Sequence, residues 1–216
     1  MTPGPFRPVA EPARALLTTV EIMTGRFPIE DVTPSVSCGR YPAKAVVGEL
    51  VPVSAVSYRE GHNALGVNVV WQRPDGHVMP FTRMRPGTPG LDQWRAVIKP
   101  DAVGRWTFAV EAFDDPYQTW RNAVVKKVGA GQGLEDLAND IAEGADVLDL
   151  ASKIVPENEQ ERVRAAAAAL RDDQRSLFAR ISPALELDQL LWDYPVRQLV
   201  TTTRSYAIWV DRPRAL

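Results

Sequence analysis

The sequence has few of the residues on which disulfide, metal or histidine chemistry depends. Its 216 residues include one cysteine, Cys38, which excludes an internal disulfide framework and a cysteine-based zinc site and fits a reducing, cytoplasmic compartment. Its two histidines, His62 and His77, are too few for a histidine-rich metal cluster and support no triad with serine or cysteine. We therefore expect no metal and no cofactor.

The sequence also lacks an excess of charge and long apolar runs. A formal net charge of -2 gives no basic footprint for nucleic acid and no polybasic membrane anchor. The longest apolar runs are too short to span a bilayer, and the proline-rich beginning of the chain has no apolar core of a signal peptide. We predict no nucleic-acid partner and no membrane partner, and we interpret residues 1–20 as an extended or disordered tail.

Alternating apolar residues before Pro116 predict a set of short strands. The clearest alternation has Trp94, Ala96 and Ile98 on one face of a segment that ends at a turn. After that turn, alternate residues from Trp106 to Ala112 share one face of a second strand. Further strands are expected over residues 27–38, 44–58, 65–71 and 78–82. Six or seven strands at this spacing indicate an immunoglobulin-like β-sandwich, although the Cys-Trp-Cys signature is absent.

After Trp120 the apolar period changes to that of helices. Four helical segments are predicted, over residues 134–155, 156–170, 173–181 and 182–194, and the third is expected to bury Leu177, Phe178 and Ile181. Residues 201–211 return to alternation, and a lone strand needs a sheet to join. The predicted fold is therefore mainly β with an α insert: a sandwich from residues 21–116 and 198–216, interrupted by a helical bundle over residues 117–197.

Three features have residue types found in catalytic or ligand sites. Glu111, Asp114 and Asp115 include the carboxylates that glycosidic chemistry uses, but a strand end and a capped turn explain them more simply. The run Gly129-Ala130-Gly131-Gln132-Gly133 lacks the Lys and Ser/Thr of a phosphate loop and is interpreted as a link between helices. The Asp172-Asp173 pair, beside two arginines, is interpreted as a solvated helix boundary. We predict no catalytic residue.

The aromatic residues have two interpretations. Trp71, Trp94, Trp106 and Phe108 lie on the inward faces of the predicted strands and are interpreted as core. A free-standing carbohydrate-binding module is the alternative, and it requires Trp120, Trp209 or another ring exposed in a flat row. An independent enzyme would require an acid pair or a nucleophile set, for which the sequence offers no defensible candidate.

Short blocks in a fixed order carry a family resemblance over nearly all of the chain after about residue 20. The blocks are Gly39-Arg40-Tyr41-Pro42-Ala43-Lys44, Val47-Gly48-Glu49, Gly61-His62, Asp92-Gln93-Trp94, Gly104-Arg105-Trp106, Glu111-Ala112 with Asp115, Thr119-Trp120-Arg121, Ala130-Gly131-Gln132 and residues 206–213. In these blocks the chain resembles the N-terminal region of α-1,4-glucan:maltose-1-phosphate maltosyltransferases, bacterial glycogen-pathway enzymes of the α-amylase superfamily.

The resemblance implies a parent enzyme that transfers maltosyl units from α-maltose 1-phosphate to α-1,4-glucans, with retention through a covalent intermediate. Its (β/α)8 barrel, with the nucleophilic Asp and the acid/base Glu, would follow the last residue of this chain and bind both substrates. No catalytic residue is therefore carried over, and the chain alone is predicted to be inactive. The resemblance also implies a homodimer to which sandwich and insert contribute, with the insert near the partner subunit's donor cleft.

Overall fold

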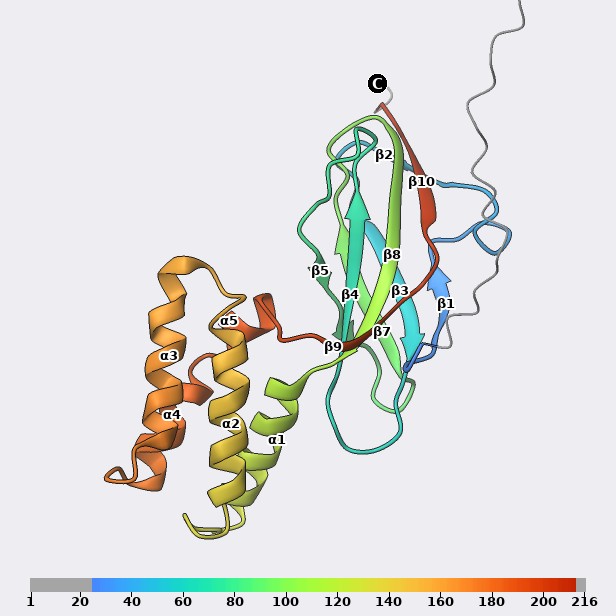
Figure 1. Ribbon diagram of the computed structural model, residues 1–216. Helices are drawn as coiled ribbons and strands as arrows, with labels where there is room; N and C mark the ends of the chain where they lie inside the picture. The colour runs from blue at the N-terminus through green and yellow to red at the C-terminus, as the bar shows by residue number, and fades with distance from the viewer. Residues whose placement is uncertain (1–24, 213–216) are drawn as a thin grey trace, which may run out of the picture.

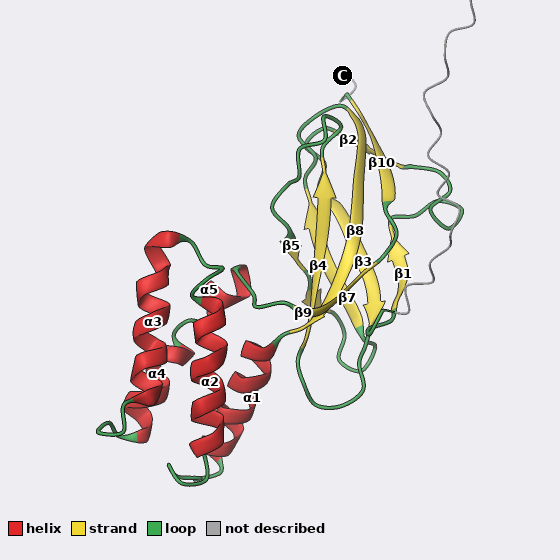
Figure 2. Cartoon of the chain, in the orientation of Figure 1, coloured by secondary structure: helices red, strands yellow, loops and turns green. Residues whose placement is uncertain are grey.

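The computed structural model describes residues 25–212, which form a β-rich part and a helical part (Figures 1 and 2). The strands are β1 (Ile29–Thr33), β2 (Ala43–Val46), β3 (Val51–Ser57), β4 (Leu65–Gln72), β5 (Thr82–Arg83), β6 (Arg85–Pro86), β7 (Gln93–Ile98), β8 (Gly104–Asp114), β9 (Gln198–Thr202) and β10 (Tyr206–Asp211). The helices are α1 (Pro116–Gly129), α2 (Ala138–Ala151), α3 (Glu157–Arg171), α4 (Leu177–Leu185) and α5 (Asp188–Asp193). The tail predicted over residues 1–20 lies outside the described residues.

The strands form two sheets that share one hydrophobic core. One sheet has the order β1-β3-β7-β6, and the other has the order β2-β10-β8-β4-β5 with β9 paired to β8. Alternate residues of both sheets point into this core, and parts of β4 and β8 are buried on both faces. Trp71, Trp106 and Phe108 belong to the core and Trp94 packs against it, which confirms that these rings are core residues.

Three predicted strands differ from the structure. Residues 44–58 form two strands in different sheets, because Gly48 adopts a left-handed backbone (φ +82°) and the chain crosses over there. Only Ile29–Thr33 of residues 27–38 is a strand, and Pro34, which has no N–H for a ladder, follows it directly. Residues 78–82 reduce to a single bridge between Gln72 and Val78, followed by the two-residue β5.

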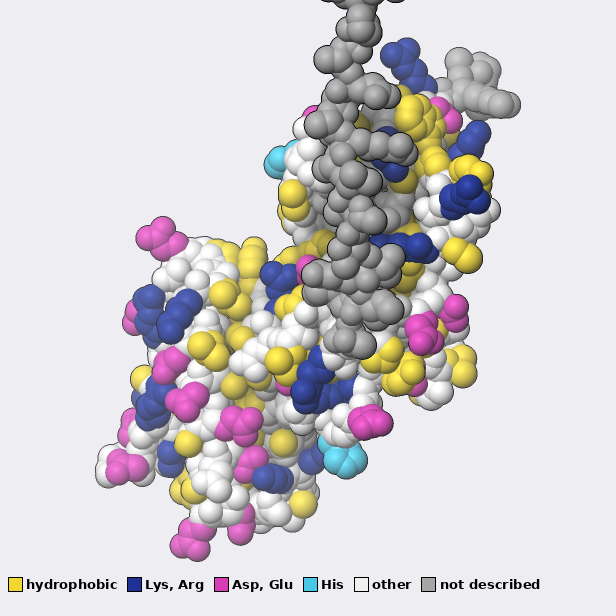
Figure 3. All heavy atoms as spheres, turned by 45° about the vertical axis from the view of Figure 1, so that its right-hand side comes forward, with side chains coloured by type: hydrophobic (Ala, Val, Ile, Leu, Met, Phe, Trp, Pro, Cys, Tyr) yellow, Lys and Arg dark blue, Asp and Glu magenta, His cyan; other side chains and the backbone are white. Residues whose placement is uncertain are grey.

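The helices enclose a second core. Neighbours in the chain pack together, α1 on α2, α2 on α3 and α3 on α4. Trp120 is only 1% exposed, and its indole N–H donates to the Asp140 carbonyl at 2.7 Å. The Tyr117 hydroxyl donates to the Ala184 carbonyl at 2.8 Å and joins α1 to α4, and burial raises the pKa of this tyrosine. Lys/Arg and Asp/Glu side chains alternate over the helical surface visible in Figure 3, so that surface carries no field of one sign.

The helix boundaries correct the sequence prediction in three places. Helix α1 precedes the first helix that periodicity predicts, which covers residues 134–155. It begins at Pro116, a position where the missing proline N–H costs no hydrogen bond. Pro183 lies inside α4 and does not open a fourth helix, because α4 begins at Leu177 with the Ser176 side chain as its cap. Phe178 was expected to be buried and is 75% exposed, since the nine-residue α4 directs Ile181 and Ala184 to the core instead.

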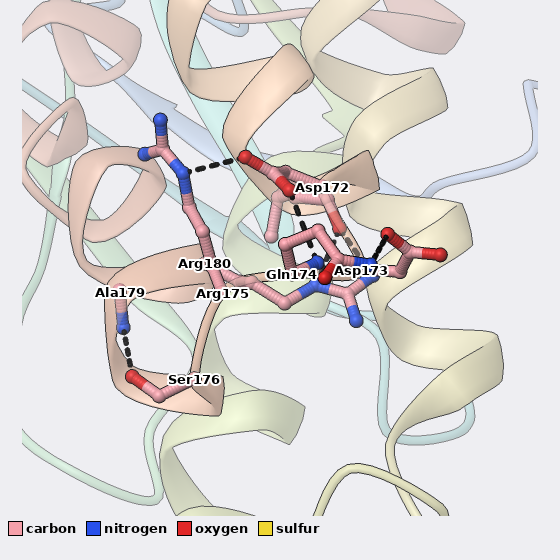
Figure 4. A network of polar contacts seen from close by, with 8 residues as sticks. Asp172, Asp173, Gln174, Arg175, Ser176, Ala179 and Arg180 are labelled. Carbon is pink, nitrogen blue, oxygen red and sulfur yellow. Dashed lines mark hydrogen bonds and ion pairs between the residues drawn. The ribbon is translucent and has the colours of Figure 1, made fainter.

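The turn between α3 and α4 is a solvated boundary, as predicted (Figure 4). Asp172 accepts from the Arg175 Nε at 2.8 Å and from the backbone N–H of Gln174 at 3.1 Å. The side-chain amide of Gln174 donates to the Asp173 carboxylate at 2.9 Å. These bonds order the turn but hold both carboxylates at the surface.

The last strand joins the sheet, as its alternation predicts. Strand β10 pairs antiparallel with β8, with Ile208 opposite Trp106, and parallel with β2. At the far end of β8, Asp114 lies opposite Gln198 of β9. The chain therefore leaves the β-rich part for the helices and returns to it at adjacent positions.

We expect the β-rich part to fold when residues 116–197 are replaced by a short glycine-serine linker, because the two ends of the removed segment are already adjacent. Far-UV circular dichroism should show a β-type spectrum, and urea should give one cooperative transition. The same deletion with Val110→Asp, which places a charge in the shared core, should abolish that transition. A linker variant as unfolded as this control would show that strands and helices form one core.

Candidate functional site at the junction of sheets and helices

Each of the three carboxylates singled out in the sequence is paired with an arginine where β8 meets α1. The pairs are Glu111 with Arg197, Asp114 with Arg59, and Asp115 with Arg83. Each of these carboxylates has an oxygen occupied by a guanidinium, whereas an acid or nucleophile of a glycosidic site must contact the substrate. The structure therefore brings these side chains to one region but uses them as ion pairs.

Asp115 is the most deeply buried of the three and has both carboxylate oxygens occupied. Its side chain accepts from the backbone N–H of Gln118 at 3.1 Å, which caps α1, and from the Arg83 Nη2 at 2.6 Å. Burial raises the pKa of Asp115, and the positive charge of Arg83 opposes that shift. Burial likewise lowers the pKa of Arg83, and Asp115 opposes it. The pair is thus a structural link between β5 and α1.

The Arg83 guanidinium also packs between two aromatic rings. The Arg83 Cζ lies 4.8 Å from the centre of the Phe113 ring and 4.6 Å from the centre of the Trp192 ring in α5. Arg85 in β6 lies 5.1 Å from the same indole. Because β5 and β6 belong to different sheets, the two arginines hold Trp192 against both sheets. Sequence reasoning missed this cluster, since contacts between residues far apart in the chain leave no periodic signal.

A hollow of about 480 Å³ opens beside this junction. Its lining comes from both parts of the protein and includes Phe81, Leu150, Ile154, Tyr194 and Arg197. Leu150, Ile154 and Tyr194 are 41–46% exposed, and Leu199 and Val200 of the adjoining β9 are 52% and 45% exposed. We call these five half-exposed residues the junction patch. Half-exposed apolar side chains that line a hollow, as Leu150, Ile154 and Tyr194 do, are typical of a protein interface.

The remaining sequence candidates lie apart from the junction. Trp120 is buried, whereas Trp209 is 43% exposed and donates its indole N–H to Asp211 at 2.9 Å. The glycine-rich run ends α1 and continues into the turn before α2, which confirms its interpretation as a link between helices. His62 and His77 lie on exposed turns. Among residues 25–212, no helix is long and apolar enough to cross a membrane.

Comparison with known sequences identifies the family. The sequence model described as "Alpha-1,4-glucan:maltose-1-phosphate maltosyltransferase, domain N/S" matches residues 25–212, the same range that the structure describes. The chain belongs to this maltosyltransferase family. The family assignment confirms the resemblance seen in the sequence blocks, and the matched range covers both the strands and the helices.

Relatives of this family align with nearly the whole chain. The maltosyltransferase of Mycobacterium tuberculosis (strain ATCC 25618 / H37Rv) is 41% identical over 94% of this chain and 32% of its own length. Maltosyltransferase 1 of Streptomyces coelicolor is 43% identical over 90% of this chain and 29% of its own length. The Rhodospirillum rubrum maltosyltransferase is 31% identical over 98% of this chain and 33% of its own length. The chain thus spans about a third of the length of these relatives.

Replacing Asp115 by alanine should lower the free energy of unfolding by about 3–5 kcal/mol, because Arg83 then remains buried without its counter-ion and α1 loses its cap. Urea denaturation measures the loss. The matched control is Asp149→Ala, which removes one of the two surface partners of Arg171, at 2.7 Å, and should cost less than about 1 kcal/mol. Equal losses of unfolding free energy in the two variants would show that the buried Arg83–Asp115 pair stabilises the fold no more than a surface pair does.

Proposed function

We propose that this chain is the non-catalytic N/S region of a maltosyltransferase that transfers maltosyl units from α-maltose 1-phosphate to α-1,4-glucans in glycogen biosynthesis. The observation that carries this proposal is the match of nearly the whole chain to about a third of each relative. The arginine pairing of Glu111, Asp114 and Asp115 supports it, because these carboxylates serve the fold. In this proposal the maltosyl transfer takes place in the remainder of the enzyme, in the cytoplasm.

The same proposal gives each part of the chain a structural role. Residues 21–116 and 198–216 are proposed to form an immunoglobulin-like sandwich, with residues 117–197 as its inserted bundle. The two separate hydrophobic cores and the adjacent ends of the insert support this division. The buried link through Arg83 and Trp192 would fix the direction of the bundle, which is what a region framing an active-site cleft requires.

We further propose that the chain contributes to a homodimer. The junction patch supports this role, because half-exposed aliphatic and aromatic side chains surround a hollow there. Stable interfaces bury about 1,200–2,000 Å² in total, and obligate ones often bury more. The remainder of the enzyme would supply part of that area, so the chain alone should associate weakly.

The alternative, a free-standing carbohydrate-binding module, requires exposed rings such as Trp120 and Trp209, and only one of these two is exposed. Trp120 is buried in the helical core, and Trp209 alone does not make a flat row. A module of that design would therefore need another aromatic surface.

Two activity assays test the function, one on the purified chain and one on a hybrid enzyme that carries this chain. The purified chain should not turn over maltose 1-phosphate, whereas the S. coelicolor relative should remain active when its matching region is replaced by residues 25–212 of this chain. An inactive, correctly folded hybrid, or turnover by the chain alone, would contradict the proposal.

Sedimentation velocity tests the association. We expect the chain to be monomeric at low concentration and to dimerise with a dissociation constant in the micromolar range or weaker, since it carries only part of the interface. Leu150→Glu with Ile154→Glu should abolish dimerisation by placing charges in the junction patch. The matched control is Leu50→Glu with Val103→Glu, which alters exposed apolar residues at the opposite end of the sheets. Dimerisation lost equally in the control would contradict the patch assignment.

A further inference from the structure

Two hollows meet at Tyr58, the residue that follows β3. Strand β3 ends on the side of the sheets from which the helices also extend (Figure 1). One, of about 390 Å³, is lined by residues 26–28 and 58–60. The other, of about 370 Å³, lies between the end of β3 and the loop before β7 and includes Asp92, Gln93 and Trp94. Tyr58 and Arg59 line both hollows, and the Tyr58 side chain is 44% exposed. We call this pair of hollows the Tyr58 groove.

The groove has rigid walls. The Ser57 hydroxyl donates to the Pro28 carbonyl at 2.8 Å, and the Ser57 carbonyl accepts from the Trp94 indole N–H at 2.9 Å. The backbone N–H of Ser57 donates to the Asp92 carbonyl at 3.0 Å, which fixes the neighbouring loop. Arg59 is held by its ion pair with Asp114. Tyr58 thus stands as an accessible ring on a preorganised base, which lowers the entropic cost of binding a ligand.

The composition of the groove fits a neutral, polyhydroxylated chain. Aromatic rings offer an apolar face, and Asp92, Gln93 and Glu60 offer hydrogen-bonding groups near it. Arginines and carboxylates are both present, so the groove has no strong preference for an anion or a cation. Two open hollows that share a ring suit an extended ligand better than a compact one.

We propose that the Tyr58 groove binds a segment of α-1,4-glucan, with a sugar ring stacked on Tyr58 and its hydroxyls hydrogen-bonded by the polar side chains beside it. The inference rests on the proposed function, because the relatives are maltosyltransferases that act on α-1,4-glucan by name. The groove would hold the polymeric substrate on the N/S region.

The test is titration of the purified chain with maltoheptaose, followed by amide chemical shifts. We expect saturable shifts at residues 57–60 and 87–94, and Tyr58→Ala should weaken binding at least about tenfold, the usual cost of losing an aromatic anchor. The matched control, Tyr41→Ala, removes a tyrosine that is 55% exposed and lines neither hollow, and it should not change the affinity. Cellohexaose, with β-1,4 links, should bind more weakly than maltoheptaose.

A second variant guards against loss of structure. Asp92→Asn keeps a residue that tolerates the left-handed backbone at this position (φ +49°) and removes only a charged acceptor, so it should weaken binding several-fold in a folded protein. Absence of saturable shifts, shifts confined to other surfaces, or equal losses in Tyr58→Ala and Tyr41→Ala would overturn the proposal.

The outcome separates this inference from the function on which it rests. A chain that binds no maltoheptaose, together with an active hybrid enzyme, would overturn the Tyr58 groove and leave the proposed function intact. Glucan binding at Tyr58 together with an inactive, correctly folded hybrid would support the Tyr58 groove and overturn the proposed function.

Discussion

The buried ion pair between Arg83 and Asp115 is the constraint on which the arrangement of the two parts depends. Removing both charges from water is costly, and their mutual attraction and hydrogen bonds offset part of that cost. Here one carboxylate oxygen caps α1, the other accepts from the guanidinium, and the guanidinium packs against Phe113 and Trp192. Asp115 thus caps the first helix, and its partner Arg83 contacts Trp192 in the last helix.

The same logic explains why acidic residues at this junction are poor evidence for catalysis. Carboxylates of a glycosidic site must differ in protonation and face a substrate. Glu111, Asp114 and Asp115 each face an arginine instead, and in all three pairs the arginine lies far from the carboxylate in the chain. The family model that matches the chain describes domain N/S of the maltosyltransferases.

Periodicity predicted those features that depend on one side chain facing one core. The inward faces of β7, β8 and β10 follow from strict alternation, and the resemblance in ordered blocks named the family correctly. Periodicity failed where the deciding contact joins residues far apart in the chain or where the element is short. Strands β5 and β6 have two residues each, too few for any period, and the Arg83–Trp192 contact has no local signature. Phe178 shows the opposite error: an apolar residue at helical spacing can still point to solvent when its helix has only nine residues.

The adjacency of Asp114 and Gln198 has a consequence for the order of folding. Pairings between β8 and the segment after the helices join residues far apart in the chain, such as Val110 and Thr203, which are separated by 93 positions. Closing a flexible loop of that length carries an entropic cost that grows with the logarithm of its length. A bundle that forms first from contacts between neighbouring helices brings the two ends together and replaces the long loop by a short gap. Early helix formation would then accelerate the search for the correct strand pairing, so the insert acts as an internal template for the fold that surrounds it.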